Sequence, residues 1–194
     1  MSGKKKQGII LASASPRRKQ LMKMAGLKFT VVPADIPEII PDGLPAEKES
    51  VYLAGIKAGY ILSENPDDLI VGADTTVICE GRVLGKPRDK AEAKEMLRFL
   101  SGKVHEVYTG VAIVSEEVNE AFTSVTKVEF YELTDEEIDW YVSTGEPMDK
   151  AGAYGAQGKA SLFVKGIEGD FFNVVGLPLC LLGSMLKGKG VTIL

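Results

Sequence analysis

Histidine, cysteine and tryptophan are scarce in this 194-residue sequence, which has one histidine, two cysteines and one tryptophan. The single histidine, His105, excludes zinc sites built from several imidazoles, and it lies in a β-like segment where we expect a structural role. Cys79 and Cys180 are far apart and lack the spacing of a zinc or redox motif, so we expect two buried thiols in a reducing compartment. Proton transfer and metal binding therefore fall to carboxylates, which favour Mg²⁺ or Mn²⁺.

Long apolar runs and a basic excess are absent too. No stretch reaches the roughly 20 apolar residues of a transmembrane helix. Residues 8–12, although they follow Lys4–Lys6, are fewer than the roughly 7 to 15 apolar residues of a secretion-signal core. The 23 basic and 27 acidic residues give a formal charge of −4, which disfavours nucleic-acid binding through phosphate contacts. We expect a soluble, cytoplasmic protein without membrane or nucleic-acid partners.

The chain length predicts one large domain or two closely packed lobes, and the apolar patterning predicts a mixed α/β protein. A chain of this size buries roughly 70% of the surface that its unfolded form exposes, so it needs no disulfide or structural metal. Periodicity, caps and turn residues predict helices at 17–25, 47–62, 89–100, 134–144 and after Pro178. They predict strands at 8–12, 28–32, 69–73 continuing to 75–79, 104–114, 121–133, 161–165 and 171–175.

Residues 12–18, Ala-Ser-Ala-Ser-Pro-Arg-Arg, stand where a strand ends and a helix begins. A helix start presents unpaired backbone amides and the positive end of the helix dipole, and both favour anions. Ser13 and Ser15 would add hydroxyl donors, and Arg17 and Arg18 would add bidentate phosphate contacts. In the alternative, Ser15 caps the helix, Pro16 fills its first turn and the arginines are solvated.

Asp74 directly follows a buried apolar strand, within Gly72-Ala-Asp-Thr-Thr76. In α/β folds ligands bind outside the carboxyl ends of strands, where this aspartate could hold a divalent cation or a water. Lys86, in the Gly-Lys-Pro turn at 85–87, would neutralise negative charge. In the alternative, Asp74 only ends the strand through a turn.

The glycine-rich residues 149–158 indicate a backbone fitted closely around something, although a surface hinge is the alternative. Gln157 in this segment offers a donor and acceptors, as recognition of a base edge requires. Three further charged residues join the candidates, although each could be an ordinary surface charge: Glu38, Lys57 and Asp170.

These candidates combine anion-binding amides, cations and carboxylates without a histidine base. Phosphoanhydride hydrolysis fits such a set, because a metal bridges phosphate oxygens, cations neutralise spreading charge and a carboxylate orients or deprotonates water. The sequence has neither the P-loop pattern nor a dinucleotide-binding fingerprint.

Several ordered motifs together resemble the Maf family of nucleotide pyrophosphatases, and the likeness covers nearly the whole chain. They lie at residues 11–18, 72–75, 85–87, 100–110, 145–155 and 169–178. The resemblance implies hydrolysis of a nucleoside triphosphate to the monophosphate and pyrophosphate with a divalent metal cation, in a cytoplasmic homodimer. It also implies one domain over residues 1–194, an elongated mixed β-sheet flanked by helices in two lobes around a cleft, similar to the inosine triphosphate pyrophosphatases.

The same resemblance suggests residue roles. Asp74 corresponds by motif to the family's proton acceptor, and substrate selection falls on Arg17, Thr75 and Gln157. Our hypothesis gives phosphate binding to Ser13, Ser15, Arg18, Lys57 and Lys86. It gives metal binding to Glu38, Asp74 and Asp170.

The motif details resemble the branch that acts on dTTP and UTP. The 7-methyl-GTP branch typically has Gln after the aspartate where this chain has Thr75, and a different glycine loop. One departure is Gly55-Ile-Lys-Ala58, where the family usually has Arg-Glu-Lys-Ala, so the charged neighbours of Lys57 are missing. Two alternatives stay open: a non-catalytic, nucleotide-sensing regulator of cell division, and a 7-methyl-GTP pyrophosphatase.

Overall fold

The computed structural model describes residues 8–191, so Lys4–Lys6 of the signal-like N-terminus lie outside the described residues. Within that range the chain forms two compact units. Unit 1 contains residues 8–74, 109–123 and 176–191, and unit 2 contains residues 75–108 and 124–175. The long strands β3, β5 and β6 each contribute residues to both units.

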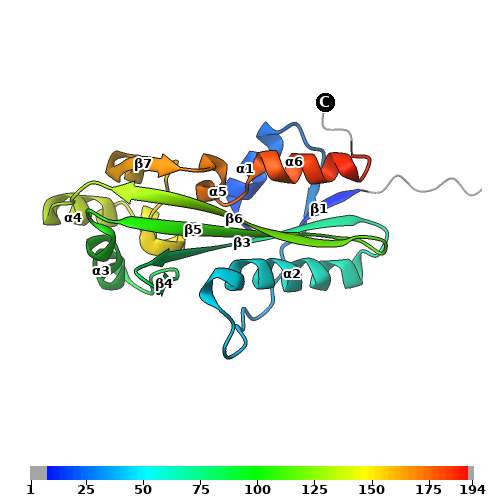
Figure 1. Ribbon diagram of the computed structural model, residues 1–194, viewed down its shortest axis with the longest axis horizontal. Coiled ribbons are helices and arrows are strands. Elements are labelled where there is room, and N and C mark those ends of the chain that lie inside the picture. The colour runs from blue at the N-terminus through cyan, green and yellow to red at the C-terminus, as the bar shows by residue number, and fades with distance from the viewer. Residues whose placement is uncertain (1–7, 192–194) are drawn as a thin grey trace, which may run out of the picture. The chain divides into compact units, whose positions relative to one another are not determined.

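The described residues contain six α-helices and seven strands (Figure 1). The strands are β1 (Ile9–Leu11), β2 (Thr30–Val31), β3 (Leu69–Cys79), β4 (Arg82–Leu84), β5 (Val104–Val114), β6 (Asn119–Phe130) and β7 (Val164–Glu168). The helices are α1 (Pro16–Met24), α2 (Ala46–Glu64), α3 (Lys90–Leu100), α4 (Asp135–Ser143), α5 (Phe171–Val175) and α6 (Leu179–Gly188). Three 3₁₀ turns add η1 (Glu146–Asp149), η2 (Ala151–Ala153) and η3 (Lys159–Phe163).

The strands form one mixed sheet in the order β2-β1-β3-β5-β6-β7, and β4 pairs with β3. Strand β1 is parallel to both β2 and β3, whereas β4 is antiparallel to β3 and β7 is antiparallel to β6. This arrangement confirms the mixed α/β sheet that the sequence predicted.

Helix α2 packs against the strands of unit 1 and carries Lys57, while α1 and α6 lie on the opposite side of these strands (Figure 1). Alternate residues of β1, β3 and β5 face α2, as a pleated strand requires. The resulting buried cluster is Ile10, Ala12, Ala54, Ala58, Ile61, Ile70, Ala112 and Val114. Small alanines on both sides of this contact bring the helix backbone close to the sheet.

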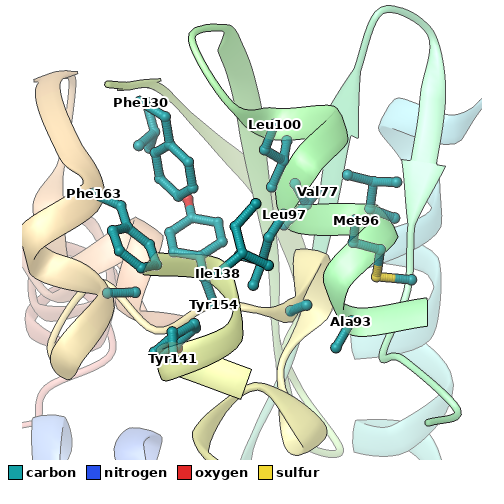
Figure 2. Close-up of a cluster of buried hydrophobic side chains, with 14 of the residues drawn as sticks. Val77, Ala93, Met96, Leu97, Leu100, Phe130, Ile138, Tyr141, Tyr154 and Phe163 are labelled. Atoms are coloured by element: carbon teal, nitrogen blue, oxygen red, sulfur yellow. The ribbon is translucent and has the colours of Figure 1, made fainter. Parts of the chain in front are cut away.

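Unit 2 has a core rich in aromatic rings (Figure 2). Phe130 meets Tyr154 edge to face at 4.8 Å between ring centroids, and Tyr141 meets Phe163 in the same way at 5.2 Å. Helix α3 contributes Leu97 and Leu100 to this cluster. The helices predicted at 89–100 and 134–144 begin with side-chain caps: Asp89 accepts from the backbone amide of Glu92, and Thr134 and Glu137 form a capping box.

Two strand predictions near the C-terminus were wrong. Residues 171–175 form helix α5, because the Asp170 carboxylate accepts the backbone amide of Phe172 and turns the chain after Gly169, whose φ is +124°. Residues 161–163 belong to η3, and strand β7 begins only at Val164.

The two cysteines differ in exposure. Cys79 is buried as predicted, but Cys180 is exposed on α6, so the prediction of two buried thiols was wrong for that residue. The buried residues of α6, Leu182 and Leu186, lie one helical turn apart, and position 180 falls on the outward side of the helix.

Within residues 8–191, no helix is both long enough and apolar enough to cross a bilayer.

Candidate active site

The start of α1 in unit 1 places Ser13, Ser15 and Arg18 in one hydrogen-bonded corner. Ser15 is the N-cap, because its hydroxyl accepts the backbone amide of Arg18 at 3.4 Å, and Pro16 is the first helical residue. The Ser13 hydroxyl accepts from the Ser15 amide and from Arg18 Nη1, both at 3.2 Å. Ser15 and Pro16 therefore take the capping and first-turn positions of the alternative reading, whereas Arg18 is turned back onto Ser13.

Arg18 is anchored rather than solvated. Its Nε donates to the carbonyl oxygen of Gly176 at 2.8 Å. Burial lowers the pKa of the Arg18 guanidinium, whereas the negative charges of Asp74 and Glu38 act to raise it. The neighbouring charge of Arg17 acts in the same direction as burial. A half-buried guanidinium held in a fixed orientation near two carboxylates is well suited to bind an anionic ligand that arrives with a cation.

Lys57 joins two carboxylates of unit 1, those of Asp74 and Glu38. Its Nζ lies 2.6 Å from Asp74 Oδ1 and 2.6 Å from Glu38 Oε1. The side chains of Lys57 and Asp74 are 10% and 15% exposed, whereas that of Glu38 is 47% exposed. The cluster is therefore desolvated at the Lys57–Asp74 contact and open to solvent at Glu38.

Asp74 lies within β3 rather than beyond its end. The sequence placed this aspartate directly after a strand of residues 69–73 and predicted β structure again at 75–79, and in the structure β3 runs through Asp74 without a break to Cys79. Thr75, Thr76 and Val77 are β-branched residues that favour an extended backbone, which explains the continuation. Asp74 is thus held by the sheet, and the reading in which it only ends a strand through a turn is excluded.

Glu49, in the first turn of α2, was not among the predicted site residues, although the negative charge of Asp74 acts on it. Burial and the negative charge of Asp74 raise the pKa of the Glu49 carboxyl. Glu49 precedes Lys57 by eight residues, or about two turns, of the same helix. This spacing, which places both residues on one side of α2, was the one sequence signal that could have added Glu49 to the candidates.

Unit 2 holds the remaining predicted site residues: Thr75, Lys86, Gln157 and Asp170. Lys86 is exposed in the turn at 85–87, and the carbonyl oxygen of Gly85 accepts from the Gly152 amide at 3.1 Å. The Gly-Lys-Pro turn and the glycine-rich segment are therefore hydrogen-bonded to each other. Gln157 is exposed between buried Ala156 and half-buried Gly158.

The carboxylates proposed for metal binding occupy different settings. Asp170 Oδ1 accepts the Phe172 amide at 2.7 Å and so caps α5. Glu38 and Asp74 share Lys57. Among residues 8–191, no three His, Cys, Asp or Glu side chains are grouped so that they could hold a metal ion by themselves. Two carboxylates with further oxygens from substrate phosphates are, however, a usual ligand set for Mg²⁺, and Glu38 with Asp74 fits it.

His105 lies in the core of unit 2. It is 1% exposed, its Nε2 lies 2.8 Å from the Tyr154 hydroxyl, and its ring meets Phe130 edge to face. Burial lowers the pKa of His105 to about 4, so the ring is neutral at physiological pH. These contacts agree with the expected structural role.

The sequence matches one protein family and its curated members over most of its length. Residues 8–189 match the family model described as Maf-like protein. The chain is 51% identical over 179 residues to a protein of Bacillus anthracis named dTTP/UTP pyrophosphatase, covering 92% of this chain and 94% of that protein. It is 50% identical over 185 residues to a protein of the same name from Bacillus cereus, covering 95% of this chain and 91% of that protein.

Solved structures with low sequence identity share the fold. The Ham1 protein of Staphylococcus aureus superposes with a TM-score of 0.54 at 14% identity, covering 94% of this chain and all of the other. A HAM1 protein from Coxiella burnetii gives a TM-score of 0.52 at 17% identity, covering 94% and 99%. At these identities the likeness concerns the fold alone.

Proposed function

The chain belongs to the Maf family, and on that premise we propose that it hydrolyses dTTP and UTP to the nucleoside monophosphate and pyrophosphate. Its relatives at about 50% identity carry the name dTTP/UTP pyrophosphatase. The observation that carries the proposal to residues of this chain is the pair of 2.6 Å contacts by which Lys57 joins Asp74 and Glu38. These contacts hold a carboxylate, which can accept a proton from water, next to a cation, which can neutralise phosphate charge. Phosphoanhydride hydrolysis requires both groups.

Asp74 acts as the base in this proposal. A water adds across the anhydride between the α- and β-phosphates, its oxygen bonds to phosphorus as the bridging P–O bond breaks, and pyrophosphate leaves. Asp74 takes the proton of that water, and Lys57 keeps the carboxylate oriented through their 2.6 Å contact. The Arg18 guanidinium, fixed by Ser13 and Gly176, binds phosphate oxygens, with Ser15, the α1 amides and Lys86 as further donors.

A divalent cation, Mg²⁺ or Mn²⁺, completes the proposed site. Such a cation supplies charge neutralisation on the phosphate oxygens when it is bound. Glu38 and Asp74 are the side chains that fit it, because they provide two adjacent carboxylates, one of them largely exposed. Asp170, the third residue of the sequence hypothesis, already accepts an amide hydrogen bond through one oxygen, so it would have only its other oxygen to offer.

Substrate selection falls on Arg17, Thr75 and Gln157 in this proposal. Gln157 is exposed and carries both an amide donor and an acceptor, which matches the imide edge that uracil and thymine share. Thr75 follows Asp74 in β3, where the 7-methyl-GTP branch typically has Gln.

Product analysis tests the proposed function. Purified full-length protein is incubated with UTP, dTTP, CTP or 7-methyl-GTP and Mg²⁺ or Mn²⁺, and the phosphorus products are separated. We expect pyrophosphate and the monophosphate from UTP and dTTP. Three results would each overturn the proposed function. They are release of orthophosphate, tight UTP binding without products (as in a sensing regulator), and faster turnover of 7-methyl-GTP.

We also propose that the protein acts in the cytoplasm as a homodimer. The compartment is supported by two free cysteines that form no disulfide. The dimer is supported by the family resemblance. Light scattering coupled to size-exclusion chromatography tests it: a mass near twice 20.9 kDa is expected, and a mass near 20.9 kDa contradicts the proposal.

A further inference from the structure

Gln157 sits on a tight turn in unit 2. The carbonyl oxygen of Gly155 accepts from the Gly158 amide at 2.9 Å, so residues 155–158 form a four-residue turn. Ala156 is buried within this turn, whereas the Gln157 side chain is exposed. The position of the Gln157 amide therefore depends on how the two ends of the turn are held.

Two side chains hold both ends of the turn. The Gly155 amide donates to the Tyr141 hydroxyl at 3.2 Å, and the Lys159 amide donates to the two carboxylate oxygens of Glu146 at 3.1 and 3.2 Å. The Tyr141 hydroxyl in turn donates to Glu146 Oε1 at 3.0 Å. We call Tyr141 and Glu146 the turn clamp.

The glycines at the ends of the turn fit against this clamp. A Cβ on Gly158 would lie 2.0 Å from Glu146 Oε1, and a Cβ on Gly155 would lie 2.6 Å from Cε of Lys150. Lys150 itself donates from Nζ to the Glu146 carbonyl oxygen at 2.6 Å. The close fit that the sequence indicated is thus made, at these two glycines, by the protein's own carboxylate and lysine.

The clamp is anchored in the core. Tyr141 is fully buried, and its ring packs edge to face on Phe163 in the aromatic cluster (Figure 2). Burial raises the pKa of the Tyr141 hydroxyl well above its ordinary value, so the hydroxyl remains a donor to Glu146 at physiological pH. The turn is therefore fixed to a rigid part of unit 2, although Gln157 itself faces solvent.

We propose that Tyr141 and Glu146 are positioning residues for base recognition, which hold the Gln157 turn so that its amide meets the pyrimidine edge. This inference rests on the proposed function, because that function assigns Gln157 to the base. A held amide contributes its hydrogen bonds to binding at a lower entropic cost than an amide on a loose loop. Loosening the turn should therefore weaken the Michaelis complex while leaving the chemistry at Asp74 intact.

A double-mutant cycle tests the inference. Glu146→Ala should raise KM for UTP about fivefold to tenfold with little change in kcat, as expected for a lost hydrogen bond. The same change made in a Gln157→Ala background should have almost no further effect, because the clamp acts through Gln157. Glu146→Gln, which keeps one acceptor oxygen, should restore part of the loss.

Controls separate positioning from general damage. Tyr141→Phe keeps the ring in the core but removes the bridging hydroxyl, so it should raise KM in the same direction, at the cost in stability of one lost buried hydrogen-bond acceptor. Glu129→Ala removes a surface carboxylate of the same unit, paired with Lys165, and should leave KM unchanged. The inference is overturned if Glu146→Ala raises KM by the same factor with and without Gln157. It is also overturned if neither clamp variant changes KM.

Binding measurements keep this test independent of turnover. The dissociation constant of an α,β-imido analogue of UTP is measured by calorimetry for the same variants, and the same pattern of non-additivity is expected. A wild type that binds the analogue but releases no pyrophosphate from UTP refutes the proposed function and leaves the inference testable. A wild type that hydrolyses UTP with an additive cycle refutes the inference alone.

Discussion

A Cβ atom on Gly72 would lie 2.3 Å from the carbonyl oxygen of Ala54. The backbone of β3 therefore touches the backbone of α2 at this point. Gly110 of β5 makes a similar approach, because its Cβ would lie 2.2 Å from the Val51 amide nitrogen. Gly72 precedes Asp74 by two residues, and Ala54 precedes Lys57 by three, so this contact sets the distance at which Lys57 meets Asp74.

Gly72→Ala should therefore damage both stability and activity. The added methyl group must push α2 away from the sheet, which we expect to lower the free energy of unfolding by about 1–3 kcal/mol. The displaced Lys57 should lower kcat/KM by about 10- to 100-fold. Urea unfolding and steady-state kinetics with UTP measure the two effects.

Gly59→Ala is the matched control on α2. Gly59 is exposed, and apart from its chain neighbours and its own helix backbone no atom lies within 4 Å of its Cβ position, so alanine should raise the free energy of unfolding by roughly 0.5–1 kcal/mol and leave activity unchanged. Equal activity of Gly72→Ala and wild type would show that the close contact does not position Lys57.

Lys57→Met should make stability depend on divalent cations. Methionine keeps the apolar stem but leaves Glu38 and Asp74 without their shared cation, so we expect a loss of about 1–3 kcal/mol in metal-free buffer. Mg²⁺ should restore more stability to the variant than to the wild type, because it takes over the neutralising role. Thermal unfolding with and without Mg²⁺ measures this difference, and equal shifts in both proteins would contradict the proposed metal ligands.

His105 should make the fold sensitive to mild acid. Its pKa is lowered by burial from 6.5 to about 4, so between these values the unfolded chain binds a proton that the folded chain does not. Stability is therefore retained above pH 6.5 and falls with decreasing pH, by about 1.4 kcal/mol per unit where the unfolded form is protonated. Urea unfolding at pH 5 to 7.5 should show a shallower decline for His105→Gln. Parallel declines in the two proteins would rule out His105 as the source.

Local chemistry in the sequence predicted most of the fold. Asp89 and the Thr134–Glu137 capping box fix helix starts through side chains close to the backbone groups that they bind, so they are visible in the sequence. Residues 171–175 show the limit, since Phe-Phe-Asn-Val-Val favours a strand but the Asp170 cap produces a helix. Strand β4 was missed because three residues are too few to give a period.

The site could be predicted by its members but not by its contacts. The motifs supplied Asp74, Lys57 and Glu38 as separate candidates, and their convergence on one Nζ depends on tertiary packing. Glycines 155 and 158 indicated a close approach, but a glycine does not tell which atom approaches it. Glu146 was therefore missed, although it lies in the motif at residues 145–155.

The most direct test of the account is the rate of pyrophosphate release from UTP by Asp74→Asn. Asparagine preserves the shape of the side chain but cannot accept the proton of the attacking water. We expect kcat to fall by about 10²- to 10⁴-fold, with the affinity for an α,β-imido analogue of UTP retained. An Asp74→Asn variant that releases pyrophosphate at the wild-type rate would contradict the assignment of Asp74 as the base.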